Sequence, residues 1–316
     1  MWRGRHNQQA RAPALPEISA FSSRVMEAII SKAATLLEAL PYMQRFRGEI
    51  FVIKYGGSFM DSPDPTVRHG VARDIVFLEA AGINPVVVHG GGKAITRALD
   101  SAGLSARFVQ GYRVTDKATI EIVEQVLSRE INPEIVAAIE EFGGKARTFA
   151  GSDTFRCHKF RPQPDAGSGA DLGFVGEVSE VDVDILRKCI GRNITPVISP
   201  TARGDDNQIY NCNADIAAAK TAIALKARRL VFMSDVPGLL RDPNDASTLV
   251  THLSVADVPA LKRAGVVSEG MIPKVDSAVA AIRAGVEKVQ FVDGRLPHSV
   301  LLEIFTDAGV GTEVVM

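Results

Sequence analysis

The feature of this sequence that most limits its fold is the alternation of short β-branched runs with amphipathic stretches. The runs predicted to be buried strands are Ile50–Lys54, Pro85–His89, Thr195–Ser199, Arg229–Ser234 and Lys288–Val292. The helical patterns that follow most of these runs are Val67–Ala81, Ala94–Ala102, Ala214–Lys226 and Pro273–Ala284. Strands that alternate with helices in this way predict a three-layer αβα sandwich, an α/β fold with a mainly parallel open sheet.

Composition and charge narrow the class of protein. The chain has 316 residues, 46% of them hydrophobic, which is enough to build the core of one large domain or two lobes. Lys plus Arg total 36 and Asp plus Glu total 37, so a dedicated nucleic-acid or anionic-membrane binder is not expected. No apolar stretch reaches the roughly 20 residues of a membrane span. Three widely spaced cysteines suggest neither a disulfide framework nor a metal site, so we expect a cytoplasmic protein.

The two ends of the first 41 residues differ in character. Residues 1–22 are polar and rich in arginine, which predicts a disordered tail and leaves an organelle transit peptide open. From Ser23 to Leu40 apolar residues recur at helical spacing, with Ser23 as a cap and Pro41 as the stop. The apolar face of this N-terminal helix packs either on its own subunit or on a partner's copy. Between Arg147 and Val178 the pattern predicts hairpins or a mobile flap instead of helices.

Three predicted strand ends carry glycines together with a lysine. They are Lys54-Tyr55-Gly56-Gly57-Ser58, His89-Gly90-Gly91-Gly92-Lys93 and Gly270-Met271-Ile272-Pro273-Lys274. Open parallel sheets bind ligands at such ends, where glycine admits a ligand close to the backbone. The triple glycine matches neither a Walker A loop nor a dinucleotide fingerprint. Lys274 begins a helix, where the helix dipole disfavours a lysine unless an anion is bound there. We interpret His89 as a core or orienting residue.

Other polar residues lie close to predicted helix starts. Asn211 and Asp215 could face a ligand, while Asn213 between them could be only an N-cap. Arg113 could clamp a carboxylate or could be a surface residue paired with Asp116. The segment Ser234-Asp235-Val236-Pro237-Gly238 could touch a nucleotide or form only a turn.

Taken together, these groups suit phosphoryl transfer to an anionic acceptor. Two lysines, two glycine-lined loops and one acid can position the reactants and neutralise their charge without a covalent intermediate. A carboxylate acceptor is already ionised near pH 7 and needs no general base. The cofactors expected for such a reaction are ATP and Mg²⁺, with the metal held mainly through the phosphates and no dedicated protein metal site.

Seven segments resemble, in order, the amino acid kinase family, and in particular its members that act on N-acetyl-L-glutamate. They are Val52–Gly57, His89–Gly92, Gly111–Thr115, Tyr210–Asp215, Ser234–Gly238, Gly270–Val275 and Leu301–Asp307. The resemblance runs from about Phe51 to Met316. It implies ATP-dependent phosphorylation of the side-chain carboxylate of N-acetyl-L-glutamate, the second step of arginine synthesis. It also implies an acetylglutamate-binding lobe over residues 42–206 and an ATP-binding lobe over residues 207–316.

By position, the resemblance assigns roles to single residues. Lys54 and Lys274 are the implied transition-state lysines, and Asp215 is the acid that organises them. The implied substrate-binding residues are Gly91, Gly92, Arg113 and Asn211, with Arg113 on the α-carboxylate. The implied ATP-binding residues are Gly56, Gly57, Ser234, Asp235, Gly238, Gly270 and Met271.

The N-terminal helix and the last segment are similar to those of arginine-inhibited, hexameric members. This implies that residues 23–41 mediate oligomerisation, giving a homo-hexamer built as a trimer of dimers. It also implies arginine as an effector, with Tyr42, His298, Glu303 and Gly309 as candidates for binding it.

Several residues depart from the family pattern and keep alternatives open. Lys93 follows the triple glycine where an uncharged residue is commoner, and Tyr112 replaces the usual leucine before Arg113. Lys93 points either to solvent or toward a different acceptor such as acetylaminoadipate. A sibling carboxylate kinase is therefore one alternative. Another is a catalytically silent arginine-binding regulator, like the kinase-like domains of some acetylglutamate synthases. Both lysines and Asp215 are present and no acetyltransferase domain follows, so we expect neither a silent regulator nor a synthase.

Overall fold

The computed structural model describes residues 23–56, 60, 62, 64–109, 111–161, 171–267, 270–307 and 309–316. The predicted tail of residues 1–22 and Gly57 lie outside the described residues. The chain divides into two units, residues 1–41 and residues 42–316.

Helix α1 (Ser23–Phe46) begins where the sequence predicts but does not end there. The predicted stop at Pro41 is wrong, because Pro41 lies inside the helix. A proline within a helix costs about 3 kcal/mol or more. Beyond it, Phe46 is fully buried and its ring packs edge-on against Phe51 at 5.2 Å, while Tyr42 contacts Phe305. We attribute the continued helix to this burial, since burying a large apolar side chain contributes about 1.5–3 kcal/mol.

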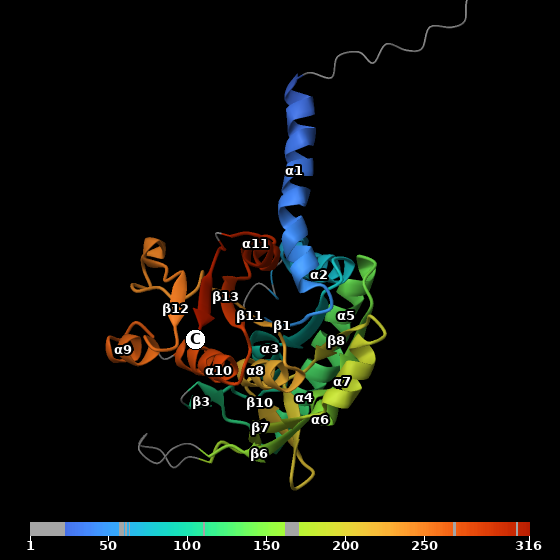
Figure 1. Cartoon of the computed structure of the whole chain (residues 1–316). Helices are drawn as coiled ribbons and strands as arrows, with labels where there is room; N and C mark the ends of the chain where they lie inside the picture. Colours follow the sequence, from blue (N-terminus) through green and yellow to red (C-terminus); the bar gives the residue numbers. More distant parts are fainter. Residues whose placement is uncertain are drawn as a thin grey trace, which may run out of the picture. The chain divides into compact units, whose positions relative to one another are not determined.

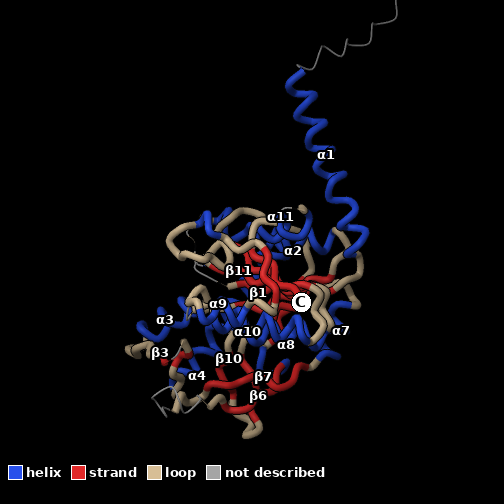
Figure 2. The backbone as a smooth tube through the Cα atoms, turned by 60° about the vertical axis from the view of Figure 1, so that its left-hand side comes forward, coloured by secondary structure: helices blue, strands red, loops and turns tan. Residues whose placement is uncertain are grey.

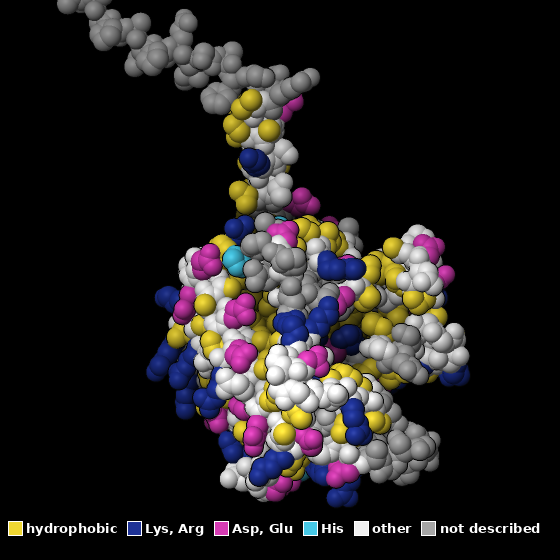
Figure 3. Space-filling view, turned by 180° about the vertical axis from the view of Figure 1, so that it is seen from behind, with side chains coloured by type: hydrophobic (Ala, Val, Ile, Leu, Met, Phe, Trp, Pro, Cys, Tyr) yellow, Lys and Arg dark blue, Asp and Glu magenta, His cyan; other side chains and the backbone are white. Residues whose placement is uncertain are grey.

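The part of α1 that precedes Pro41 carries an apolar face. Its large hydrophobic side chains are 43–67% exposed in the single chain. Figure 3 shows hydrophobic side chains along this helix. They are Val25, Met26, Ile29, Ile30, Leu36, Leu37 and Leu40.

The larger unit is built on an eight-stranded sheet with the order β12-β14-β13-β11-β1-β2-β8-β5. All neighbouring pairs are parallel except β13 with β14. All five predicted strands are confirmed, whereas β5, β12 and β14 were not predicted. The strands are β1 (Ile50–Tyr55), β2 (Asn84–His89), β5 (Ala146–Phe149), β8 (Thr195–Ile198), β11 (Arg229–Ser234), β12 (His252–Ser254), β13 (Lys288–Asp293) and β14 (Thr312–Val315).

Helices cover both faces of this sheet and complete the predicted three layers (Figures 1 and 2). Helices α2, α5 and α11 pack on one face, and α7, α8 and α10 pack on the other. The four predicted helices of this unit are confirmed within two residues at each end. The helices are α2 (Pro65–Ala80), α3 (Gly92–Ser101), α4 (Lys117–Glu124), the π-helix η2 (Gln125–Ile131), α5 (Asn132–Glu141), α6 (Gly151–Thr154), α7 (Val183–Ile190), α8 (Ala214–Leu225), the 3₁₀-helix η4 (Ala246–Thr248), α9 (Val258–Arg263), α10 (Ile272–Arg283) and α11 (Ser299–Phe305).

Two smaller β elements lie outside the large sheet. Four strands, β6 (Phe155–Lys159), β7 (Val175–Val181), β9 (Thr201–Gly204) and β10 (Ile209–Cys212), close into a small barrel. The antiparallel β6–β7 pair confirms the hairpin predicted in the middle of the chain. Strand β5 in the same stretch was not expected. It belongs to the edge of the large sheet, where it pairs in parallel with β8. A short hairpin joins β3 (Phe108–Val109) and β4 (Tyr112–Arg113).

The core is apolar and the surface carries charges of both signs, as the composition predicts. The core contains Val52, Val86 and Phe232 from neighbouring strands, each fully buried. The three cysteines are free and buried. Figure 3 shows Lys and Arg side chains interspersed with Asp and Glu side chains over the face in view. Among the helices described, none has the length and apolar character needed to cross a membrane.

Candidate active site

The parallel strands β1, β2 and β11 end at the same edge of the sheet, and the predicted site residues gather there. Lys54 lies beside Val88 of β2 and Phe232 of β11. The loop after β2 is tied back to β1, because the Gly90 N–H donates to the Tyr55 carbonyl at 2.7 Å. A Cβ at Gly56 would stand 2.6 Å from the Lys54 Nζ. Glycine is therefore needed at position 56 for the Lys54 side chain to fold over the backbone.

A buried aspartate joins the two predicted lysines. Asp215 lies in the first turn of α8, and its Oδ1 is 3.1 Å from the Lys54 Nζ. Its Oδ2 accepts a hydrogen bond of 2.6 Å from the Lys274 Nζ. Lys274 lies in the first turn of α10, 220 residues beyond Lys54. The fold thus brings all three predicted catalytic residues into contact.

The charges of these three groups shape one another. Burial alone would raise the pKa of Asp215, but the two ammonium groups and their hydrogen bonds lower it to about 2. Burial lowers the pKa of Lys54, Asp215 opposes this change, and Lys274 adds to it. The cluster therefore holds an ionised acid between two cations and carries a net positive charge that suits an anionic ligand.

A cavity of about 370 Å³ opens on one side of this cluster. Its lining contains both lysines and every predicted ATP-binding residue that the structure describes, namely Gly56, Ser234, Asp235, Gly238, Gly270 and Met271. A Cβ at Gly238 would stand 2.4 Å from the Thr312 hydroxyl, so only glycine fits there. The apolar part of the wall includes Val236, which belongs to the predicted Ser234–Gly238 segment; sequence reasoning missed its other members, Leu239, Leu240, Pro243 and Val266.

A second cavity of about 180 Å³ is lined by the loop Gly90–Gly92. Its lining contains all four predicted substrate-binding residues, Gly91, Gly92, Arg113 and Asn211. A Cβ at Gly91 would stand 2.5 Å from Ile131 and 2.6 Å from Leu127 of η2, which explains the glycine. This cavity lies close to the Lys54 and Asp215 cluster, because its lining includes Ala214, the neighbour of Asp215, and Gly90, which is hydrogen-bonded to Tyr55 beside Lys54.

Arg113 is built into the second cavity and does not lie on the surface. It is 6% exposed, and its Nη2 donates to the Gly92 carbonyl and to the Thr96 hydroxyl, both at 2.9 Å. Its Nη1 is buried without a hydrogen-bond partner. The alternative pairing with Asp116 is wrong, since Asp116 caps α4 by accepting from the Thr119 N–H. Thr96 was missed, because only the fold brings it near Arg113.

Two residues with open interpretations prove to be structural. Asn213 is the N-cap of α8 and accepts from the Asp215 and Ile216 N–H groups. His89 is fully buried, and its Nδ1 lies 2.8 Å from the Gly90 carbonyl. Burial lowers the pKa of His89 to about 4, so the ring is neutral near pH 7.

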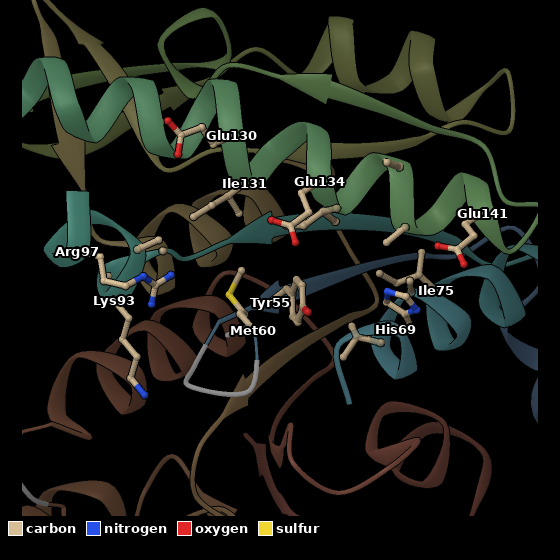
Figure 4. Close-up of a pocket in the computed structure, with 18 of the residues that line it drawn as sticks. Tyr55, Met60, His69, Ile75, Lys93, Arg97, Glu130, Ile131, Glu134 and Glu141 are labelled. Carbon is tan, nitrogen blue, oxygen red and sulfur yellow. The ribbon is translucent and has the colours of Figure 1, made fainter. Parts of the chain in front are cut away.

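A third cavity, of about 560 Å³, lies between α2, α3 and α5 (Figure 4). Gly91 and Gly92 border both this cavity and the second one. Lys93 is exposed and lines only the third cavity, where Figure 4 shows its side chain extending away from the helix that carries Glu130 and Glu134. Lys93 therefore does not contribute to the wall of the second cavity.

Two of the four candidates for arginine binding, Glu303 and Gly309, lie together, and a third, Tyr42, contacts Phe305 and Asp307 in the same segment. Glu303 is 7% exposed and accepts from the Val310 N–H at 2.7 Å, the Gly311 N–H at 3.0 Å and the Gln290 amide at 2.9 Å. A Cβ at Gly309 would stand 3.0 Å from the Glu303 carboxylate. The Tyr42 hydroxyl donates to Asp307, which lies close to Gly309 in the sequence. His298 instead pairs with Asp74 of α2, with 2.6 Å between Nδ1 and Oδ1.

The described residues contain no group of three or more His, Cys, Asp or Glu side chains arranged for a metal. A metal bound in the cavity lined by Lys54 and Lys274 would thus take most of its ligands from elsewhere, as Mg²⁺ does when nucleotide phosphates carry it.

Comparisons of sequence agree with this geometry. The amino acid kinase family matches residues 49–293. An acetylglutamate kinase of Carboxydothermus hydrogenoformans is 46% identical over 292 residues, which cover 91% of this chain and 99% of that protein. An acetylglutamate kinase of Akkermansia muciniphila is 45% identical over 288 residues, which cover 91% of this chain and 96% of that protein.

Comparisons of structure show the same fold in solved proteins. The N-acetylglutamate synthase from Neisseria gonorrhoeae, complexed with coenzyme A and N-acetyl-glutamate, matches with a TM-score of 0.79 at 25% identity over 90% of this chain. This chain spans only 63% of that synthase. The carbamate kinase from Giardia lamblia bound to AMP-PNP has the same fold, with a TM-score of 0.61 at 15% identity over 85% of this chain and 98% of that one. The chain belongs to the amino acid kinase family.

Proposed function

We propose that this protein transfers the γ-phosphoryl group of ATP to the side-chain carboxylate of N-acetyl-L-glutamate. The products are ADP and N-acetyl-L-glutamyl 5-phosphate, and the reaction is the second step of arginine biosynthesis. The observation that carries the proposal is the contact of Lys54 and Lys274 with Asp215, where both lysines line one cavity and Ala214, next to Asp215, lines a second cavity. The identity of 46% to an acetylglutamate kinase over nearly the full length of both chains supports the choice of acceptor.

The roles of the three charged residues follow from their contacts. In phosphoryl transfer the protein mainly positions the reactants and neutralises the charge that spreads over the equatorial oxygens. Lys54 and Lys274 supply two cations, and Asp215 holds both ammonium groups in position. One lysine can then exchange its contact with Asp215 for a contact with a phosphate oxygen. Mg²⁺, carried on the phosphates, supplies further charge neutralisation, and Ser234, Asp235 and Gly238 line the cavity that would hold the nucleotide.

The second cavity suits an N-acylated acid better than a free amino acid. Its described lining includes Arg113 and Asn211 but no aspartate or glutamate. The unpartnered Nη1 of Arg113 can donate to an α-carboxylate, which satisfies an otherwise costly buried group. A free α-ammonium group would meet no counter-charge on these walls, whereas an amide nitrogen needs none.

We extend the proposal to regulation and assembly. Arginine binds to Tyr42, Glu303 and Gly309 and inhibits the enzyme. His298 lies near Glu303 in the sequence. The apolar side chains of residues 23–41 associate with copies of the same chain and form a hexamer as a trimer of dimers; their exposure in the single chain supports this. Residues 42–206 and 207–316 act as the acceptor and nucleotide lobes.

An acceptor panel tests the function directly. The chain is incubated with MgATP and hydroxylamine, which traps an acyl phosphate as a coloured hydroxamate. We expect product with N-acetyl-L-glutamate and far less with N-acetylaminoadipate, glutamate or aspartate. Preference for acetylaminoadipate would indicate a sibling kinase, and no product with any acceptor would indicate a silent arginine-binding regulator.

The assembly and the effector have separate tests. Removal of residues 1–40 should lower the mass in solution, measured by light scattering, while the shortened chain keeps its kinase activity. An unchanged mass would contradict the role given to residues 23–41. Glu303→Gln should weaken inhibition by arginine while turnover without arginine stays close to that of the unaltered chain; equal inhibition of both proteins would contradict the effector site.

A further inference from the structure

The hairpin β3–β4 carries Arg113 but is too short to fix its own position. Each strand has only two residues, and the register pairs Phe108 with Arg113 and Val109 with Tyr112. An isolated two-stranded hairpin is marginally stable at best, even when it is longer than this. The position of the Arg113 guanidinium therefore depends on what the hairpin contacts.

The base of the hairpin is tied to the chain that leads into the small barrel. The Thr115 N–H donates to the Leu172 carbonyl at 2.9 Å, and the Phe174 N–H donates to the Thr115 carbonyl at 2.6 Å. These two bonds hold the residues after Arg113, and a further support holds the hairpin at Tyr112, directly before it.

That support is a stacked pair of rings. Tyr112 lies on Phe160 with 4.3 Å between ring centroids and 26° between ring planes. Phe160 follows β6 directly, and its N–H donates to the Val175 carbonyl at 2.8 Å. Tyr112 and Val175 both line the second cavity. The stack thus joins the hairpin, through Phe160, to barrel strand β7, whose Val175 also lines that cavity.

The guanidinium is enclosed by this arrangement. Its carbon lies 4.7 Å from the ring centroid of Phe108, which is 57% exposed. On its other side the Nη2 group is fixed by Gly92 and Thr96 of α3. A shift of the hairpin would move Phe108 and the Arg113 backbone together, because these two residues are register partners.

We propose that Tyr112 and Phe160 form an aromatic clamp that positions Arg113 for the carboxylate of the acceptor. The inference rests on the proposed function of the second cavity. The clamp acts on acceptor binding and not on phosphoryl transfer, because neither ring belongs to the cluster of Lys54, Asp215 and Lys274. Tyr112 acts through its ring, which stacks on Phe160; burial and then Glu177 raise the pKa of its hydroxyl, so the hydroxyl brings no charge to the stack.

The clamp is tested by steady-state kinetics of the full chain in the hydroxamate assay. Tyr112→Ala and Phe160→Ala should each raise the KM for N-acetyl-L-glutamate about 3- to 10-fold, the range expected for one aromatic pair. The KM for ATP and kcat should stay within about 2-fold, because the nucleotide cavity is unchanged. Tyr112→Phe keeps the stack and should restore the acceptor KM.

A double variant and a control separate positioning from general damage. Tyr112→Ala with Phe160→Ala should raise the acceptor KM no more than either change alone, since both remove the same contact. Phe142→Ala removes a ring that contacts His69 and Arg73, outside the second cavity, and should leave the acceptor KM unchanged. If Tyr112→Ala does not fold, Tyr112→Leu provides the ringless variant.

Each remaining outcome has a definite meaning. An unchanged acceptor KM in the single variants, or a double variant whose effect equals the product of the two single effects, overturns the clamp. An equal fall in kcat for every variant also overturns it, because the pair would then serve only stability. A wild-type chain that forms no acyl phosphate overturns the proposed function as well, so the two failures are distinguishable.

Discussion

Two buried aspartates of this protein have pKa values that are shifted in opposite directions. Asp215 of α8 is 7% exposed and Asp74 of α2 is 1% exposed, so both lose most of their hydration. Ion pairing lowers the pKa of Asp215 to about 2 in spite of its burial. Burial raises the pKa of Asp74 to about 6, although His298 opposes the change through its hydrogen bond and charge.

The difference lies in the partners and in the place on the helix. Asp215 contacts two ammonium groups and lies in the first turn of α8, where the helix dipole favours a negative charge. Asp74 lies in the interior of α2 and contacts a single imidazole whose side chain is 52% exposed. Burial alone therefore does not decide whether a carboxylate is ionised; the number of fixed cations beside it does.

The largest effect should come from neutralising the acid of the ion-pair cluster. Asp215→Asn leaves two lysines close together with no counter-charge, and both should move apart or lose their alignment. We expect kcat to fall roughly 1000-fold or more, beyond the loss of one preorganised contact. The hydroxamate assay with N-acetyl-L-glutamate measures it.

The matched control is the same substitution at the other buried acid. Asp74→Asn should keep kcat within about 3-fold, because Asp74 lines neither the acceptor nor the nucleotide cavity. Comparable losses in the two variants would show that any buried carboxylate is needed, and the catalytic role of Asp215 would have to be abandoned.

Removing one of the two cations should have the next largest effect. Lys274→Ala keeps Asp215 paired with Lys54, and we expect turnover to fall on the order of 100-fold, typical of one preorganised transition-state contact. Lys262→Ala is the control, since Lys262 forms an ion pair with Asp276 near the surface and such pairs contribute little. Turnover of Lys274→Ala equal to that of Lys262→Ala would contradict the assigned role.

The parallel strands and the helices of this fold could be predicted because their signals are local. Strand β11 was predicted at both ends, since its residues form one β-branched and apolar run. Helix α1 was cut short at Pro41, because the burial of Phe46 that offsets the proline depends on contacts distant in sequence. Strand β5 was missed for the same reason: it is fixed by its parallel pairing with β8 and not by its own pattern.

In the candidate site, glycines and charged residues could be predicted, while their apolar and hydroxyl neighbours could not. Lys54, Lys274 and Asp215 stand in unusual contexts, next to glycines or at helix starts, and this marks them in the sequence. Thr96 and Phe108 have no such context. Thr96 contacts Arg113 because α3 meets the β3–β4 hairpin, and Phe108 contacts it because the hairpin register pairs the two residues; no local pattern encodes either contact.

The stability of the fold should respond to pH through Asp74 in a window separate from that of Asp215. Because the pKa of Asp74 is raised in the folded protein, its contribution to stability is fully present below the unfolded pKa near 3.8. This contribution is lost as pH rises through about 6. The lowered pKa of Asp215 gives the opposite sign, with stability lost only as pH falls below about 4 toward 2. Between pH 4.5 and 7, Asp74 should thus cost on the order of 2 kcal/mol.

Urea unfolding at several pH values measures this contribution, with Asp74→Asn as the reference protein. Burial also raises the pKa of Glu79, which adds a slope of the same sign, so only the difference between the two proteins isolates Asp74. The unaltered chain should lose stability relative to Asp74→Asn as pH rises. Parallel curves for the two proteins would mean that Asp74 is ionised throughout this window.

The smallest effect should come from the imidazole beside Asp74. His298 has a left-handed backbone, with φ of 59°, and asparagine tolerates this conformation better than most residues. His298→Asn therefore keeps the backbone and a hydrogen-bond donor but removes the ring that can be protonated. Because the charge of His298 lowers the pKa of Asp74, its loss should move the midpoint of the pH-dependent stability change upward by a fraction of a pH unit. A midpoint that moves downward would show that the imidazole destabilises the carboxylate, and the contrast with the lysine pair at Asp215 would then be one of sign and not of strength.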